Sequence, residues 1–361
     1  MTVISWWEIF AWSFSPLGWL WQAVTAADAQ SFLPSAHNLC NVLIAILVAL
    51  ALDRLWGEPP VWLHPVVYMG KVLGALGRVL APRTEVANDY LRFVLAALVW
   101  CALAAIVFIG YWIIQFFLPY QPWWLPGICV GVLLKPLLSW RMLKDEVLAV
   151  EAALQQSLPA GRERLSWLVS RDTSQLDAAT VRESAIETLA ENLADSVIAP
   201  LFWFLVAGLP GAAVYRLANT ADAMWGYPGW RGQGDQRRHW QWAGKWAARA
   251  DDVLNWIPAR ITAAWLALVA GGVHWQGLRR DAQVTPSPNG GWPMGAMARA
   301  LGVHLSKPGV YQLNPEGRVP ESADLQRSIH LASKVVAVQV FCAVVAMILM
   351  SIWMWKVSAH G

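Results

Sequence analysis

Long apolar runs alternate with polar stretches along this chain. The runs at residues 39–53, 91–118, 123–140 and 334–356 contain very few charged residues. A helix crosses a bilayer with about 20 predominantly apolar residues. We therefore predict a membrane-spanning helix in each of these runs, and the run at 91–118 is the clearest of them.

Two further apolar runs, 197–215 and 256–275, are interrupted by helix-breaking residues. The breakers are Pro200, Gly208, Pro210 and Gly211 in the first run, and Pro258, Gly271 and Gly272 in the second. Irregular backbone is tolerated at membrane depth where it lines protein or a cavity. We predict that at least one of these runs is re-entrant or only partly inserted, which gives four to six membrane-embedded helices in all.

The polar stretches indicate the topology. Residues 54–90, 141–196, 216–255 and 276–333 each contain several Lys or Arg, whereas the link at 119–122 contains none. Cytoplasmic loops carry an excess of these residues. The pattern predicts a multi-pass membrane protein with all four polar stretches in the cytoplasm as helical loops.

The first 36 residues differ from the rest, because they are rich in Trp and contain no Lys or Arg. We predict that residues 1–36 form an N-terminal extension with an interfacial or weakly spanning helix. Residues 37–356 are predicted to form a single membrane domain.

The composition supports an all-α polytopic membrane protein. Of the 361 residues, 57% are hydrophobic and 14% are charged, whereas soluble domains contain about a quarter charged residues. The net charge of +3 is small, and no basic run is dense enough to follow a phosphate backbone. These features argue against nucleic acid as a partner. They indicate instead that the protein is embedded in a lipid bilayer.

Four acids stand on one helical stripe just before an apolar run: Glu183, Glu187, Glu191 and Asp195 recur every four residues. Like charges at this spacing repel by a few tenths of a kcal/mol per pair. A solvated face is one explanation. The other is a cation, because Mg²⁺ binds one or two carboxylates together with substrate phosphates.

The segment "SRDTSQLD" (170–177) precedes this stripe. Asp177 is placed to cap the helix that follows. Arg171, with the hydroxyls of Thr173 and Ser174, suits a phosphate group, although an ordinary helix cap with a surface arginine is the alternative.

Acids, amides and bases also gather in the stretch 216–260. Asn219 and Asp222 share one helical face, and Asp251, Asp252 and Asn255 share another. Lys245 and Arg249 precede the second group. Ligands for a metal beside bases for phosphate indicate a triphosphate site, and the alternative is a solvated helix start.

Two rigid loops complete the candidate chemistry. His64 lies in "GEPPVWLHP" (57–65), where it is either a catalytic base or an incidental part of a stiff turn. The segment "TPSPNGGWP" (285–293) predicts a tight loop that is either structural or approaches a ligand through its backbone.

These segments occur in a recognisable order. They are "GEPP" with "HP", "SRDTSQLD", "ETLAENLAD", "VIAPLFW", "NTADAMWGY", "DDVLNWIPAR" and "PSPNGGWP". The chain resembles the CobD/CbiB family, the adenosylcobinamide-phosphate synthases of cobalamin biosynthesis, from about residue 45 to residue 305. Small departures include Ser196, where a glycine is expected after the acid.

The resemblance implies an ATP-dependent ligase. Such an enzyme joins (R)-1-amino-2-propanol, or its O-phosphate, to the propionate carboxylate of adenosylcobyric acid and forms adenosylcobinamide or its phosphate. ATP and Mg²⁺ are the implied cofactors, and other enzymes of the pathway are possible partners. The corrinoid is a substrate, and walls rich in Trp such as Trp225, Trp230 and Trp242 would suit it, although packing is the stronger explanation of these residues.

The resemblance also implies roles for the candidate residues. The metal ligands would be Glu187, Glu191, Asp195, Asp222, Asp251 and Asp252. The catalytic residues would be His64, Arg171, Asp172, Lys245 and Arg249. Substrate and nucleotide would contact Thr173, Ser174, Asn192, Asn219, Asn255, Arg260, Ser287 and Asn289.

Two other classes of protein fit parts of the pattern. A non-enzymatic membrane sensor or regulatory protein could use the same scaffold, but the polar motifs are intact here. A transporter would place ionisable residues within its apolar runs, whereas here they lie outside them.

Overall fold

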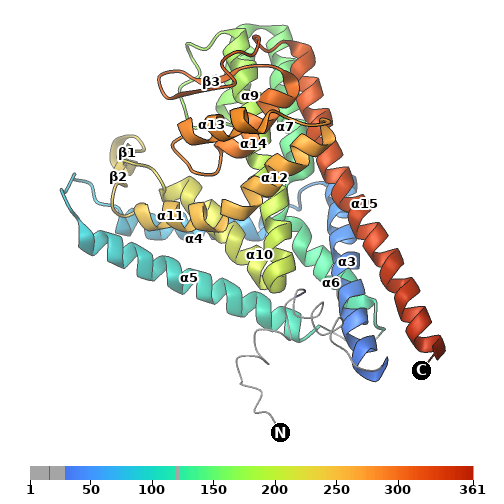
Figure 1. Cartoon of the computed structure of the whole chain (residues 1–361). Helices are drawn as coiled ribbons and strands as arrows, with labels where there is room; N and C mark the ends of the chain where they lie inside the picture. Colours follow the sequence, from blue (N-terminus) through green and yellow to red (C-terminus); the bar gives the residue numbers. More distant parts are fainter. Residues whose placement is uncertain (1–15, 17–28, 119–121, 361) are drawn as a thin grey trace. The chain divides into compact units, whose positions relative to one another are not determined.

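The computed structural model is helical almost throughout (Figure 1). It describes Pro16 and residues 29–118 and 122–360. Residues 1–15 and 17–28 of the predicted extension therefore lie outside the described residues, and its residues 29–36 are helical. The longer elements are α3 (Ala29–Trp56), α4 (Pro65–Leu80), α5 (Tyr90–Phe116), α6 (Leu125–Leu134), α7 (Trp140–Gln156), α8 (Leu158–Ser166), α9 (Ala178–Leu193), α10 (Ala199–Trp225), α11 (Lys245–Leu254), α12 (Trp256–Val269), α13 (Trp275–Val284), α14 (Gly291–Leu301) and α15 (Ser322–His360).

The short elements connect these helices. They are η1 (Val61–Leu63), η2 (Lys135–Leu137), the π-helical turn η3 (Ala194–Ile198), η4 (Gly234–Gln236), β1 (Trp230–Arg231), β2 (Arg238–His239), β3 (Leu305–Lys307) and β4 (Tyr311–Leu313). The strands form two antiparallel hairpins, β1–β2 and β3–β4.

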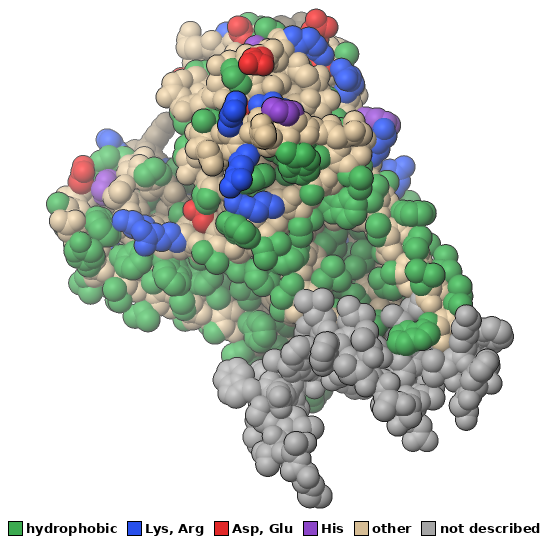
Figure 2. All heavy atoms as spheres, viewed as in Figure 1, with side chains coloured by type: hydrophobic (Ala, Val, Ile, Leu, Met, Phe, Trp, Pro, Cys, Tyr) green, Lys and Arg blue, Asp and Glu red, His purple; other side chains and the backbone are tan. Residues whose placement is uncertain are grey.

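Five helical segments of the described residues are long and apolar enough to cross a membrane. They are His37–Trp56, Tyr90–Phe116, Leu125–Gln156, Ala178–Trp225 and Ser322–Ala346. The protein is thus an α-helical, multi-pass membrane protein by length and composition of its helices. On α5 only 6% of the apolar window is buried, and Figure 2 shows hydrophobic side chains along this helix, as expected of a helix that faces lipid.

The chain folds into two compact units. The first unit comprises Met1–Leu138, Pro200–Val253 and Val340–Gly361, and the second comprises Ser139–Ala199 and Leu254–Gln339. Each is discontinuous in sequence. That residues 37–356 form a single domain stays a prediction.

In the first unit, the predicted span at 123–140 is interrupted. Helix α6 gives way to the turn η2 at Lys135, and Leu138 is extended. Two glycines set the packing of α6 on α3. A Cβ on Gly127 would lie 2.8 Å from the Asn41 carbonyl oxygen, and one on Gly131 would lie 2.7 Å from Cβ of Val48. Small residues at this spacing let two helix backbones approach closely.

The break predicted in the apolar run at 197–215 is present in α10. Ala207 and Gly208 leave the helical conformation, and Gly208 has φ +65°. Pro210 follows, so the helix loses backbone hydrogen bonds here. The freed N–H of Leu209 donates to the Gln115 side-chain oxygen at 3.1 Å. Within the first unit, a polar side chain of α5 thus satisfies the backbone N–H that the kink frees.

The second unit contains the other broken run. Helix α12 ends at Val269, and Gly271 and Gly272 both have positive φ. With 14 residues, α12 is shorter than the five candidate spans. Whether the α10 run or the α12 run is re-entrant stays a prediction.

Candidate active site

Helix α9 of the second unit carries the first three acids of the stripe, and the π-helical turn η3 carries Asp195. Helix α9 begins where Asp177 accepts a hydrogen bond from the Thr180 backbone N–H at 2.8 Å. Upstream, Asp172 accepts one from Ser174 N–H at 2.8 Å. These bonds hold the pKa values of Asp172 and Asp177 below their usual range. The predicted cap at Asp177 is confirmed.

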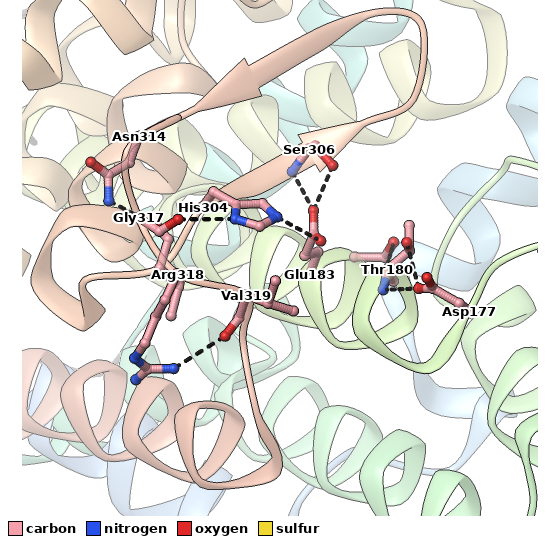
Figure 3. A network of polar contacts seen from close by, with 11 residues as sticks. Asp177, Thr180, Glu183, His304, Ser306, Asn314, Gly317, Arg318 and Val319 are labelled. Carbon is pink, nitrogen blue, oxygen red and sulfur yellow. Dashed lines mark hydrogen bonds and ion pairs between the residues drawn. The ribbon is translucent and has the colours of Figure 1, made fainter.

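The first acid of the stripe, Glu183, anchors the β3–β4 hairpin (Figure 3). Its Oε2 accepts hydrogen bonds from the Ser306 backbone N–H at 2.7 Å and from the Ser306 hydroxyl at 2.6 Å. His304 Nε2 lies 3.3 Å from its other oxygen. Glu183 is 3% exposed. These contacts give it a structural role, separate from the other acids.

The second acid, Glu187, is buried and paired with Arg171. One guanidinium nitrogen of Arg171 lies 3.1 Å from Glu187 Oε2 and also donates to the Ser184 hydroxyl. The other terminal nitrogen of Arg171, Nη1, is buried and has no hydrogen-bond partner among the described residues. The fold therefore aligns Arg171 with the stripe and leaves one donor for another group.

The third acid, Glu191, faces the loop at 285–293. A Cβ on Gly290 would lie 2.9 Å from Glu191 Oε1, so glycine is needed for this approach. Tyr311 of β4 lies beside the same acids. Burial raises the pKa of Tyr311, and the charges of Glu187 and Glu191 raise it further. Tyr311 therefore stays a neutral hydroxyl beside these two acids, and it donates to Met294 Sδ at 3.8 Å.

The fourth acid, Asp195, accepts a hydrogen bond from the side-chain amide of Asn255. Asn255 is 4% exposed, and its Oδ1 is buried without a partner among the described residues. Nearby in the chain, Arg260 donates to Asn289 Oδ1 at 3.4 Å and lies over the rings of Trp256 and Trp292. The fold of the second unit thus links Asp195 to the segment 255–260, and that segment to residues 289–292.

The remaining candidates of the second unit have local roles. Thr173 is buried and donates to the Arg162 carbonyl, and Asn192 donates to the Thr188 carbonyl one turn earlier. The Ser287 hydroxyl accepts from the Asn289 N–H at 3.2 Å and closes the predicted tight loop.

The first unit holds its own polar chain. Arg216 donates to Asn219 Oδ1 at 3.3 Å, and the Asn219 amide lies 3.5 Å from Asp251 Oδ1. One turn later, Asp222 packs so tightly against Gly226 that a Cβ on this glycine would overlap its Oδ1. Asn219 of the first predicted polar group therefore contacts Asp251 of the second.

A buried ion-pair chain surrounds His64 in the first unit. Lys135 Nζ lies 3.0 Å from Asp53 Oδ1 and 3.0 Å from Glu58 Oε2. His64 Nε2 lies 3.1 Å from the same Glu58 oxygen, and its Nδ1 is buried without a partner among the described residues. A carboxylate only accepts, so Nε2 is the donor in this contact and Nδ1 is the ring nitrogen that has no partner in the described part of the chain.

Lys245 and Arg249 differ in their surroundings. The Lys245 ammonium lies 4.3 Å from the centre of the Trp242 ring, whereas Arg249 is exposed. Trp225 is 1% exposed and donates to the Leu73 carbonyl at 3.1 Å, so packing accounts for it. Trp230 remains 40% exposed.

The oxygen donors of the second unit can be weighed against the needs of Mg²⁺. Within residues 29–118 and 122–360, no group of three or more His, Cys, Asp or Glu side chains is arranged to hold a metal ion. Mg²⁺ needs only one or two carboxylates when substrate phosphates supply the rest. The unpartnered Asn255 Oδ1 lies beside the Asp195 carboxylate. These are the oxygen ligands that Mg²⁺ prefers, so the chemistry of these residues fits this ion.

Comparison with known proteins identifies the relationship. A family model described as CobD/Cbib protein matches residues 46–356. The chain belongs to the CobD/CbiB family. A probable cobalamin biosynthesis protein CobD of Methanothermobacter thermautotrophicus is 40% identical over 274 residues, which is 74% of this chain and 85% of that protein. No solved structure matches the chain.

Two bacterial relatives extend this similarity. The cobalamin biosynthesis protein CobD of Chromobacterium violaceum is 39% identical and covers 81% of this chain and 93% of its own length. The cobalamin biosynthesis protein CobD of Rhodobacter capsulatus is 36% identical, and the match covers 82% of this chain and 95% of that protein. Membership of the CobD/CbiB family supports a role in cobalamin biosynthesis, and every candidate site residue lies within the matched range.

The structure adds site residues that sequence reasoning missed. Tyr311, His304 and Ser306 reach the acidic helix from the β3–β4 hairpin, and Glu58 and Lys135 surround His64. The first three lie in no conspicuous motif. Glu58 stands in the "GEPP" segment, and Lys135 is a lone charge in an apolar run, which is a signal of a buried partner.

Proposed function

We propose that the chain is an ATP-dependent, amide-forming ligase of cobalamin biosynthesis. It would join (R)-1-amino-2-propanol, or its O-phosphate, to the propionate carboxylate of adenosylcobyric acid. The observation that carries this proposal is the family match over residues 46–356, within which each polar motif is intact. The protein would lie in the cell inner membrane with its polar stretches in the cytoplasm.

Amide formation requires an activated carboxylate. In the proposed sequence, the γ-phosphoryl group of ATP moves to the propionate, which gives an acyl phosphate and ADP. The amine attacks the acyl carbon, the bond from that carbon to the phosphate oxygen breaks, and the nitrogen loses a proton. The products are the amide and inorganic phosphate.

The residues of the second unit would handle the phosphate groups. The unpartnered Nη1 of Arg171 is available to a phosphate oxygen. Glu191, Asp195 and the Asn255 oxygen are the donors proposed for Mg²⁺, which would supply neutralisation of the phosphate charge. The loop at Gly290 approaches Glu191 and would bring its backbone to the same ligand.

In the first unit, His64 is proposed as a general base. Its Nδ1 is unpartnered in the described structure and its Nε2 is held by Glu58, which is the arrangement of an oriented general base. Within the first unit, Asp222, Asp251 and Asp252 are proposed as metal ligands, and Lys245 and Arg249 as phosphate contacts.

The test is turnover by the purified full-length protein in detergent. Adenosylcobyric acid and ATP–Mg²⁺ are supplied with aminopropanol or with its phosphate, and corrinoid amide is measured. We expect product with one of the two amines, and none with Asp252→Asn. Gln276→Ala, on the exposed side of α13, is the matched control. A wild-type protein that forms no amide with either amine would favour the sensor alternative.

A further inference from the structure

The β1–β2 hairpin of the first unit borders a cavity lined by arginines. The cavity has a volume of about 210 Å³, and Arg78, Arg231, Arg238, Gln236, Trp225 and Trp240 are among the residues around it. None of the described residues that line it is acidic. The cavity therefore combines concentrated positive charge with an apolar wall.

The strand register places two of these charges directly opposite each other. Arg231 of β1 pairs with Arg238 of β2, and like charges in such a pair destabilise a hairpin. Three glycines with positive φ, Gly229, Gly232 and Gly234, form the turns. An anion between the two arginine side chains would offset their repulsion.

Backbone carbonyls hold both guanidinium groups, and the Arg231 group also lies 3.7 Å from the centre of the Tyr227 ring. Arg238 is 7% exposed, and its Nη1 donates to the carbonyls of Asp235 and Arg237. Arg231 uses Nη1 for the carbonyls of Ala223 and Met224. In the described residues neither arginine forms an ion pair. A buried guanidinium without a counter-charge is costly, and its fork matches the oxygens of a phosphate.

A neighbouring cavity provides an internal contrast. It has a volume of about 400 Å³ and is lined by Arg83, Trp230, Arg237 and Arg238, but also by Asp235. Glu85 lies 3.9 Å from His239 on the same hairpin and lines neither cavity. Of the two cavities, the smaller one is therefore the one that arginines line without an acid among the described residues.

The hairpin also lies at the end of a spanning helix. The His239 N–H donates to the Pro82 carbonyl at 2.9 Å, and the Trp242 ring lies 4.9 Å from that of Tyr90, the first residue of α5. Lipid headgroups surround the ends of such helices. We propose that this arginine-lined cavity binds a phosphate group, carried either by an anionic lipid headgroup or by a soluble phosphate ester.

The proposal is independent of the ligase reaction and is tested by binding to full-length protein in neutral detergent. One arm measures labelled inorganic phosphate and phosphoethanolamine by equilibrium dialysis. The other titrates phosphatidylglycerol and phosphatidylcholine and counts retained lipid by native mass spectrometry. The variants are Arg78→Gln, on the exposed last turn of α4, and Arg231→Gln. Arg280→Gln, exposed on α13, is the matched control.

We expect Arg78→Gln and Arg231→Gln each to weaken binding by about tenfold, since each removes a charge-assisted contact. Arg280→Gln should bind as the wild type does, and Arg78→Lys should recover part of the loss. If the glutamine variants bind the dialysis probes more weakly than the wild type does, the ligand is a soluble phosphate ester. If they lose affinity only for phosphatidylglycerol, the ligand is a lipid headgroup. The proposal is overturned if both glutamine variants match the wild type in both arms, or if the wild type binds none of the probes.

Discussion

The side-chain amide of Asn255 donates a hydrogen bond to the carboxylate of Asp195, across 60 residues of sequence. This bond joins the end of the acidic helix to the start of α12, within the second unit. It also fixes the orientation of Asn255, whose oxygen is left buried without a partner among the described residues. The fold therefore leaves an amide oxygen acceptor beside a carboxylate.

The first prediction concerns this pair. Asn255→Ala should lower kcat/KM by roughly 100-fold, as the loss of one oriented polar group in an active site does. The amide formed from corrinoid substrate is the measurement, and thermal melting in detergent checks the fold. Gln276→Ala should leave turnover unchanged. Normal turnover by Asn255→Ala would remove the residue from the site.

The second prediction separates structure from catalysis on the acidic stripe. Glu183→Ala should destabilise the protein by about 3 kcal/mol, because it leaves the Ser306 N–H, the Ser306 hydroxyl and His304 without their buried acceptor. Chemical denaturation in detergent measures this loss. Glu183→Gln retains an acceptor and should cost less. A Glu183→Ala protein as stable as the wild type contradicts the anchoring role.

The third prediction concerns Tyr311. Tyr311→Phe removes a neutral hydroxyl beside Glu187 and Glu191, and we expect turnover to fall by about tenfold, the effect of one lost hydrogen bond of about 1.4 kcal/mol. The retained ring should keep the melting temperature close to that of the wild type. A fall in stability without a fall in turnover would assign Tyr311 to packing alone.

The fourth prediction is a pH dependence of stability. Burial alone would raise the pKa of Glu58, but hydrogen bonds from His64 and Lys135 and the charge of Lys135 bring it below its usual value of 4.5. A lowered pKa stabilises the folded state above the unfolded pKa, and this contribution disappears as the pH falls through the folded pKa. Wild-type stability should therefore decline below about pH 4.5.

Glu58→Gln is the comparison for this pH effect. It should be less stable than the wild type at neutral pH, and the difference should shrink as the pH falls below 4.5. Denaturation midpoints across this range are the measurement. A difference that does not change with pH would mean that the ionisation of Glu58 does not contribute.

The fifth prediction concerns the kink in α10. Gly208→Ala should destabilise the fold by about 1–3 kcal/mol, because φ +65° strains a residue with a Cβ. Gln115→Leu should cost about 1–3 kcal/mol by leaving the Leu209 N–H unsatisfied. Ile114→Leu, a volume-conserving change on exposed α5 surface, should cost far less. Equal stability of all three variants would show that the kink is not stabilised in this way.

Much of the helical architecture is predictable from local pattern. The apolar runs at 39–53, 91–118 and 334–356 coincide with α3, α5 and α15, because hydrophobic length is a property of contiguous residues. The break at Gly208 and Pro210 and the cap at Asp177 are local as well. The interruption of 123–140 at Lys135 is not predictable in this way, since Lys135 pairs there with the distant Asp53.

The amino-acid sequence by itself determined that this is a helical membrane protein of the CobD/CbiB type, with acids, amides and bases in ordered motifs. Only the tertiary structure decided which of these groups meet. Glu183 accepts hydrogen bonds from the β3–β4 hairpin, Glu187 forms an ion pair with Arg171, and Asp195 accepts a hydrogen bond from Asn255. The physical reason is that helical periodicity places side chains on a common face, whereas their partners come from segments distant in sequence, which packing alone brings within hydrogen-bonding distance.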